Sequence, residues 1–104
     1  MSSVKYEMVM CIVNEGFSEA VMDAAREAGA KGGTVLSGHG TANKDAEELF
    51  NINIEPQKNI VIIIVPEEIK DAVLKSLYEK VGMDTPCKGI AFSVPVDSAV
   101  GIKH

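Results

Sequence analysis

The stretch Lys58-Asn59-Ile60-Val61-Ile62-Ile63-Ile64-Val65-Pro66 decides how the rest of the chain is arranged. Its unbroken Ile/Val run predicts a strand buried on both faces, and hence a central position in a sheet. Pro66 then opens a helix, where its missing N–H carries no cost. The apolar stripe of this helix recurs at helical spacing: Ile69, Val73, Leu77 and Val81. Gly82 is predicted to end it.

A similar unit precedes this one. Tyr6 to Val13 is apolar except for Glu7 and predicts a buried strand that ends at Asn14-Glu15-Gly16. Ser18 is a predicted N-cap, with Glu19 in the first turn of the helix. The apolar face of that helix holds Phe17, Val21, Ala24 and Ala28. Gly29 ends it, and Gly32-Gly33 leads into a short strand, Thr34 to Ser37.

The last predicted strand is Ile90 to Val96, after a loop from Met83 to Gly89. Pro95 cannot donate to a strand ladder, so we expect this stretch to be an edge strand or the end of a strand. The order β-α-β, long loop, β-α-β predicts one α+β domain over residues 1–104. Its fold is ferredoxin-like (split βαβ-βαβ), with a four-stranded antiparallel sheet and two helices on one face. We expect nine residues to be buried: Met8, Val9, Ile12, Val21, Val61, Ile63, Val73, Leu77 and Phe92.

The connection from Gly38 to Gln57 shows no clear regular element, although Asp45 to Phe50 has the spacing of a helical turn. A connection this long in so small a domain is functional or disordered in most proteins. The other face of the sheet needs a cover that 104 residues do not supply. Packing of open faces in a ring of copies is the natural solution.

Composition excludes several classes of partner. The net charge of -5 and pI of about 4.9 argue against nucleic acid and against an anionic membrane surface. The longest apolar run, Ile60 to Val65, is too short for membrane insertion. Cys11 and Cys87 form no CxxC pair, and the N-terminus lacks a signal-peptide pattern. We therefore expect a cytoplasmic protein with free thiols.

No catalytic constellation is recognisable. The histidines are His39 and His104, and neither belongs to a motif with a serine or cysteine nucleophile. Their spacing with Cys87 matches no zinc pattern, so we expect no metal site and no enzyme. The acidic residues Asp45, Glu47 and Glu48 are typical of a solvated loop, while magnesium binding by a slow ATPase stays open as an alternative.

Glycines give a better signal than titratable residues. Gly38 and Gly40 flank the long loop, and Gly82 and Gly89 flank the second loop. Backbone N–H groups approach a phosphate where no side chain intrudes, and Lys88 adds a cation beside Gly89. From the residues alone, the prediction ends at a ferredoxin-like domain with a long loop and candidate anion-binding turns.

Three segments resemble the PII nitrogen-regulatory superfamily. They are Ala24-Ala25-Arg26-Glu27-Ala28-Gly29-Ala30-Lys31-Gly32-Gly33-Thr34-Val35, Ile62-Ile63-Ile64-Val65-Pro66-Glu67 and Lys88-Gly89-Ile90-Ala91-Phe92-Ser93-Val94-Pro95-Val96. Gly38-His39-Gly40-Thr41 also stands where the regulatory loop of that family begins. The resemblance implies a homotrimeric signalling protein that binds an adenine nucleotide between subunits and regulates a target, such as a membrane transporter, through the long loop.

The resemblance also implies site residues and an effector. The implied nucleotide-binding residues are Thr34, Gly38, Gly40, Lys88, Gly89 and Lys103. The implied partner-binding residues of the loop, about 38–57, are His39, Thr41, Glu47, Glu48 and Phe50. No cofactor is obligatory, and ATP, ADP, AMP or a cyclic nucleotide is the expected effector.

The sequence lacks several of the positively charged residues that are typical of the family. Ile90 stands where relatives carry a lysine after the phosphate-loop glycine, and Gly101 and Lys103 stand where they carry arginines. Arg26 is the one arginine of the chain, so bidentate clamping of phosphate is not expected. Two alternatives stay open: a scaffold trimer without a ligand, and a metal-binding protein of ferredoxin-like fold.

Overall fold

The computed structural model describes residues 4–41 and 56–102. Its elements follow the predicted order, with one helix in each half. They are β1 (Tyr6–Asn14), α1 (Ser18–Glu27), β2 (Thr34–His39), β3 (Gln57–Pro66), α3 (Glu67–Val81) and β4 (Ile90–Val96). The predicted helical turn from Asp45 to Phe50 lies outside the described residues.

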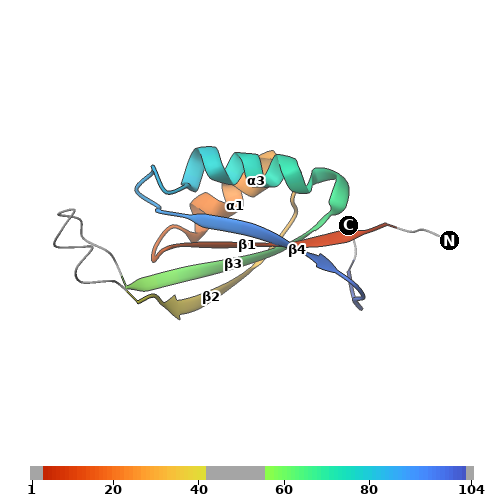
Figure 1. Cartoon of the computed structure of the whole chain (residues 1–104), viewed down its shortest axis with the longest axis horizontal. Coiled ribbons are helices and arrows are strands. Elements are labelled where there is room, and N and C mark those ends of the chain that lie inside the picture. The colour runs from red at the N-terminus through yellow and green to blue at the C-terminus, as the bar shows by residue number, and fades with distance from the viewer. Residues whose placement is uncertain (1–3, 42–55, 103–104) are drawn as a thin grey trace.

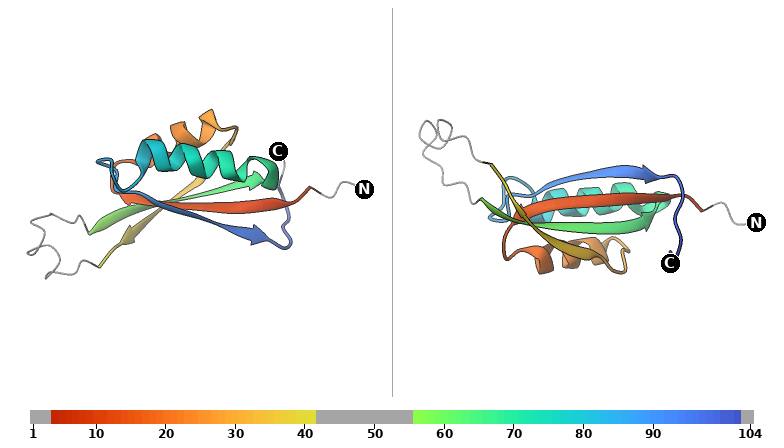
Figure 2. Two further views of the ribbon diagram at one scale, coloured as in Figure 1. Left: turned by 45° about the horizontal axis from the view of Figure 1, so that its top comes forward. Right: turned by 90° about the horizontal axis from the view of Figure 1, so that it is seen from below.

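The four strands form one antiparallel sheet in the order β2-β3-β1-β4. Both helices lie on the same face of it, and among the described residues the opposite face carries no second layer (Figures 1 and 2). This is the predicted α+β, ferredoxin-like arrangement. Its β3 strand is internal and β4, which contains Pro95, is an edge strand, as predicted.

The core lies between the sheet and the helices. Alternate residues of β1 and β3 point into it, because successive side chains of a strand face opposite sides. The side chains that are fully buried there include Val9, Val13, Val21, Val61, Ile63, Val65, Val73 and Leu77. Six of the nine predicted core residues belong to this layer and are confirmed: Val9, Val21, Val61, Ile63, Val73 and Leu77.

The other face of the sheet was predicted less well. Met8 and Ile12 are only partly buried, and Phe92 is 41% exposed, so its predicted burial is wrong for a single chain. The run in β3 is likewise buried on one face and half-buried on the other. The physical reason is that no described element of this chain covers that face. An unbroken apolar run thus indicated two apolar faces, but not which one the chain itself covers.

The helix ends mostly follow the predicted signals. Gly29 takes a φ of 106°, which favours glycine, and its N–H donates to the carbonyl of Arg26. Gly82 follows α3 directly. Ser18, however, is the first helical residue, and the N-cap position is held by Phe17 with no side-chain hydrogen bond. The prediction that Ser18 caps this helix is therefore wrong.

The second strand is longer than predicted. Gly38 pairs with Lys58 and His39 with Gln57 in the β2–β3 ladder, although glycine and histidine gave no strand signal. Beyond the ladder, the Gly40 N–H donates to the Pro56 carbonyl at 2.6 Å. The connection between β2 and β3 therefore begins later than predicted, because Gly38 and His39 still belong to the strand ladder.

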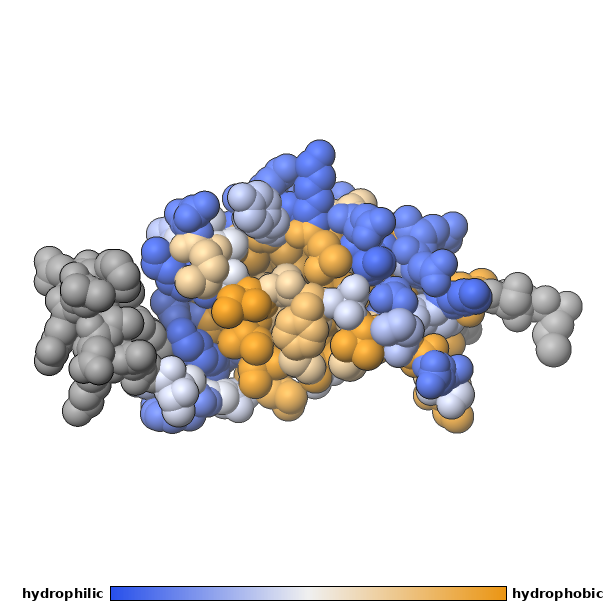
Figure 3. All heavy atoms as spheres, viewed as in Figure 1, coloured by the Kyte–Doolittle hydropathy of each residue, from blue (hydrophilic) through white to orange (hydrophobic). Residues whose placement is uncertain are grey.

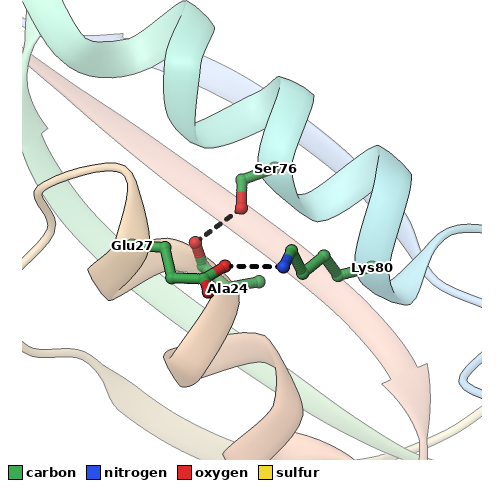
Figure 4. Close-up of polar contacts among 4 residues, drawn as sticks. All are labelled: Ala24, Glu27, Ser76 and Lys80. Atoms are coloured by element: carbon green, nitrogen blue, oxygen red, sulfur yellow. Dashed lines mark hydrogen bonds and ion pairs between the residues drawn. The ribbon is translucent and has the colours of Figure 1, made fainter.

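Two polar contacts fasten the helices to each other (Figure 4). The Ser76 hydroxyl donates to the Ala24 carbonyl at 2.7 Å in a partly buried position. The Lys80 ammonium lies 2.9 Å from a carboxylate oxygen of Glu27 on the exposed side. In the part of the chain that the structure describes, no helix is long and apolar enough to cross a membrane.

Candidate nucleotide site

The predicted nucleotide-binding residues fall at two places on the sheet. Thr34 begins β2 at one edge, while Lys88 and Gly89 come directly before β4 at the other. Because β3 and β1 lie between these edges, three inter-strand spacings separate them, about 14 Å. One chain therefore does not bring Thr34 and Lys88 together, and a site that uses both has to form between two copies.

A surface pocket of about 320 Å³ lies at Thr34. It is bordered by the linker before β2, by the open face of β3 and by the last described residues of the chain. Its lining residues are Lys31, Gly32, Gly33, Thr34, Ile62, Ile64, Gly101 and Ile102. The pocket combines apolar side chains of β3 with backbone groups, the hydroxyl of Thr34 and the ammonium of Lys31. This combination suits a ligand that has a flat ring with polar groups at its edge.

Gly33 explains how the linker reaches this pocket. A Cβ built on Gly33 would lie 2.9 Å from the sulfur of Met22 and 3.0 Å from the Ile62 carbonyl oxygen. Both separations are tighter than most real Cβ contacts, and the Ile62 oxygen belongs to backbone that cannot move aside as the Met22 side chain can, so this position favours glycine. The linker thus passes tightly between α1 and β3 and delivers Thr34 to the pocket.

The second place is the loop from Gly82 to Gly89. These two glycines form a parallel β-bridge, and the Gly89 N–H donates to the Val81 carbonyl at 2.7 Å. A Cβ on either glycine would overlap a backbone carbonyl, of Tyr78 or Val81 respectively. Both glycines are therefore needed to close the loop, whether or not a ligand approaches it.

Lys88 has an unusual backbone within this loop. Its φ is 52°, in the left-handed region that residues other than glycine rarely adopt. Its ammonium group donates to the carbonyl of Met83 at 3.2 Å and is exposed. Outliers of this kind concentrate at functional sites and therefore support the loop as a candidate site.

A further cation, which the sequence analysis did not select, lies at the same end of the sheet. Lys58 is the second residue of β3, pairs with Gly38, and donates from its ammonium to the Asn14 side-chain oxygen at 2.6 Å in a partly buried position. A Cβ on Gly40 would come within 3.1 Å of the Lys58 side chain, so that glycine leaves room for it. The available signal was a lone lysine at the start of an apolar strand.

The remaining predicted residues are placed only in part. His39 ends β2, where its ring nitrogen lies 3.5 Å from the Gln57 side-chain nitrogen, and Thr41 is exposed just beyond it. Glu47, Glu48, Phe50 and Lys103 lie outside the described residues. Across 4–41 and 56–102, no three His, Cys, Asp or Glu side chains gather as a metal-binding group.

A smaller cavity of about 150 Å³ lies between α3 and β4. Its lining is mostly apolar, and Cys11 forms part of it together with Leu77, Val81 and Ala91. Burial, together with a smaller contribution from the nearby Cys87, raises the pKa of the Cys11 thiol to about 12. A thiol held in its protonated form is a poor nucleophile, so this cavity offers no obvious chemistry.

Comparison with solved structures places this fold among PII-like proteins. A Thermus thermophilus protein described as a PII-like signalling protein superposes with a TM-score of 0.68, at 21% identity, over 92% of this chain and 90% of its own. CPII from Thiomonas intermedia K12, a nitrogen regulatory PII-like protein solved with ADP, AMP and bicarbonate, has a TM-score of 0.63 at 21% identity, over 94% and 97%.

Arabidopsis thaliana PII bound to citrate gives a TM-score of 0.65 at 21% identity, over 90% of this chain and 77% of that protein. No curated protein sequence matches the chain significantly. The sequence profile of the family described as nitrogen regulatory protein P-II matches residues 6–104, nearly the whole chain. The chain therefore belongs to the P-II family of nitrogen regulatory proteins.

Proposed function

We propose that this protein is a regulatory homotrimer that binds an adenine nucleotide between its subunits. The observation that carries the proposal is the separation of Thr34 from Lys88 and Gly89 at opposite edges of one sheet. Copies arranged in a ring bring unlike edges of neighbouring subunits together, so each cleft receives both halves of the site. The solved relative with ADP and AMP supports the same ligand class.

The open face of the sheet supports the trimer. The three outward-facing β4 residues Ile90, Phe92 and Val94 are 55%, 41% and 41% exposed, and Leu36 of β2 is 46% exposed. Figure 3 shows hydrophobic atoms gathered over the middle of the molecule, where β4 lies. A contiguous apolar surface on a single domain marks a protein interface. Contact between three such faces gives each copy the layer that its own chain lacks.

The regulatory output runs through the β2–β3 hairpin. Its neck is fixed by the His39–Gln57 pairing and by the hydrogen bond from Gly40 to Pro56, so the two described ends of the long connection form a paired base. This base lies at the same end of the sheet as Lys58 and the loop from Gly82 to Gly89 (Figure 1). A ligand held there contacts the neck directly, and the segment beyond it docks on a target protein, a transporter or an enzyme. The protein itself acts as a regulator, without catalysis.

Calorimetric titration tests the proposal. ATP, ADP, AMP and cyclic AMP are each titrated into the protein with and without magnesium. We expect micromolar binding of at least one nucleotide, weakened at least tenfold by Lys88→Ala. Lys75→Ala, which removes an exposed lysine of α3, is the matched control and should bind normally.

The second candidate function is a scaffold trimer without a ligand. It is favoured by the way Lys88 already donates to Met83 within its own loop. A protein that has the mass of three chains and binds none of the four nucleotides would establish this alternative and overturn the regulatory one. If the Lys88→Ala protein binds nucleotide with unchanged affinity, the nucleotide does not bind at the loop from Gly82 to Gly89.

A further inference from the structure

The loop from Gly82 to Gly89 has few donors left for a phosphate. The Thr85 N–H donates to the Gly82 carbonyl, and the Lys88 N–H donates to the Thr85 carbonyl. The Cys87 N–H donates to the Thr85 hydroxyl at 3.2 Å. The Gly89 N–H is also used, and Pro86 has no N–H. From Thr85 to Gly89, therefore, no backbone N–H is left to join a nest around an anion.

The charged groups of the described residues also offer little to a chain of several phosphates. Lys88 is the one lysine of this loop, and Asp84 in the same loop offsets its charge. Arg26, which is on α1, lies 3.9 Å from the carboxylate of Asp23. Lys31 and Lys58 stand singly at the pocket and at the loop neck. A triphosphate, with several negative charges, would meet isolated cations in a protein of net charge -5.

We infer that the site selects a nucleotide with a single phosphate group over a nucleoside triphosphate. This inference rests on the proposed function, since it takes the loop from Gly82 to Gly89 as the phosphate end of the cleft. A single phosphate needs one cation and a few neutral donors, which Lys88 and the backbone of the exposed residues Met83 and Asp84 supply. Within residues 82–89 each further phosphate adds charge that meets no second cation, and an unpaired charge at a binding site opposes binding.

The ratio of two dissociation constants tests the inference. We expect AMP to bind at least tenfold more tightly than ATP in calorimetric titrations without magnesium. With magnesium added, the dissociation constant for AMP should still be the lower of the two. A dissociation constant for ATP equal to or below that for AMP overturns the inference and leaves the proposed function intact. Absence of binding by every nucleotide overturns the proposed function, and this inference with it.

A charge-reversal variant tests the cause. Asp84→Lys gives the loop a second cation, so we expect the affinity for ATP to rise at least fivefold and that for AMP less than twofold. Asp71→Lys is the matched control, because it changes the net charge equally at a carboxylate that is 90% exposed near the start of α3, far from this loop. Equal gains for ATP in both variants would show that net charge, and not the loop, sets the preference, and would overturn the assignment.

Discussion

The two faces of the sheet carry similar side chains but differ sharply in how the chain covers them. On the helix side, Val9, Val61 and Ile63 are fully buried. On the open side, the equally apolar Phe92 and Val94 keep 41% of their surface exposed. The helices cover one apolar face, whereas the uncovered apolar face is the surface that the proposed trimer would bury.

The largest expected effect is at the open face. Phe92→Asp places a carboxylate where the proposed trimer brings the copies together, and burying an unpaired charge there is strongly unfavourable. We expect the mass measured by light scattering to fall from three chains to one. Tyr78→Asp, at a side chain that is 72% exposed on α3, is the control and should keep the mass of the parent protein. A Phe92→Asp protein that still has the mass of three chains would refute the role given to this face.

The next largest effect is the difference in stability cost between a covered and an uncovered valine of the sheet. Val61 and Val35 are paired across β3 and β2, but Val61 is fully buried and Val35 is 47% exposed. We expect Val61→Ala to lower the free energy of unfolding by about 2–3 kcal/mol, from lost burial plus the cavity left behind. Val35→Ala should cost less than about 1 kcal/mol in the same urea titration. Equal costs would mean that a neighbouring copy covers Val35 as completely as the helices cover Val61.

The comparison of faces also shows what the sequence was able to predict. Local signals located both helices and the central strand, because apolar spacing and the glycines at 29 and 82 act over a few residues. The sequence pattern made Phe92 a core residue, because hydrophobicity does not reveal which face the chain itself covers. Phe92 is 41% exposed because no described element of its own chain covers that face.

The residues proposed for the site could be named from the sequence, but their arrangement in space could not. Glycine spacing indicated the two loops, and the resemblance to PII proteins selected Thr34 and Lys88. That the hairpin continues through His39, and that Lys58 reaches Asn14, depend on pairing between segments distant in sequence. Such pairing leaves no local signature when the residues are glycine, histidine and lysine.

A smaller effect concerns the pH dependence of the covered face. Burial raises the pKa of Cys11 to about 12 from the 9.0 of an exposed thiol, so the unfolded chain loses this proton at a lower pH than the folded protein does. Stability from this group is therefore complete below pH 9 and is lost as the pH rises toward 12. Between about pH 8 and about pH 10 we expect a loss of about 1 kcal/mol that Cys11→Ala abolishes. Urea titrations with a reductant present measure it, and parallel slopes for the two proteins would contradict it.

The smallest effects lie in the helix layer itself, where a partly buried contact and an exposed one can be compared directly. Ser76→Ala leaves the Ala24 carbonyl without its donor, and we expect a loss of about 1 kcal/mol in the free energy of unfolding. Lys80→Ala removes an ammonium whose pKa is raised by its hydrogen bond to Glu27, but both groups face solvent. Solvent and salt screen an exposed pair, so its removal should shift the urea midpoint less than Ser76→Ala does. A larger shift for Lys80→Ala would mean that this ion pair, and not the burial between α1 and α3, sets the spacing of the helices that cover the sheet.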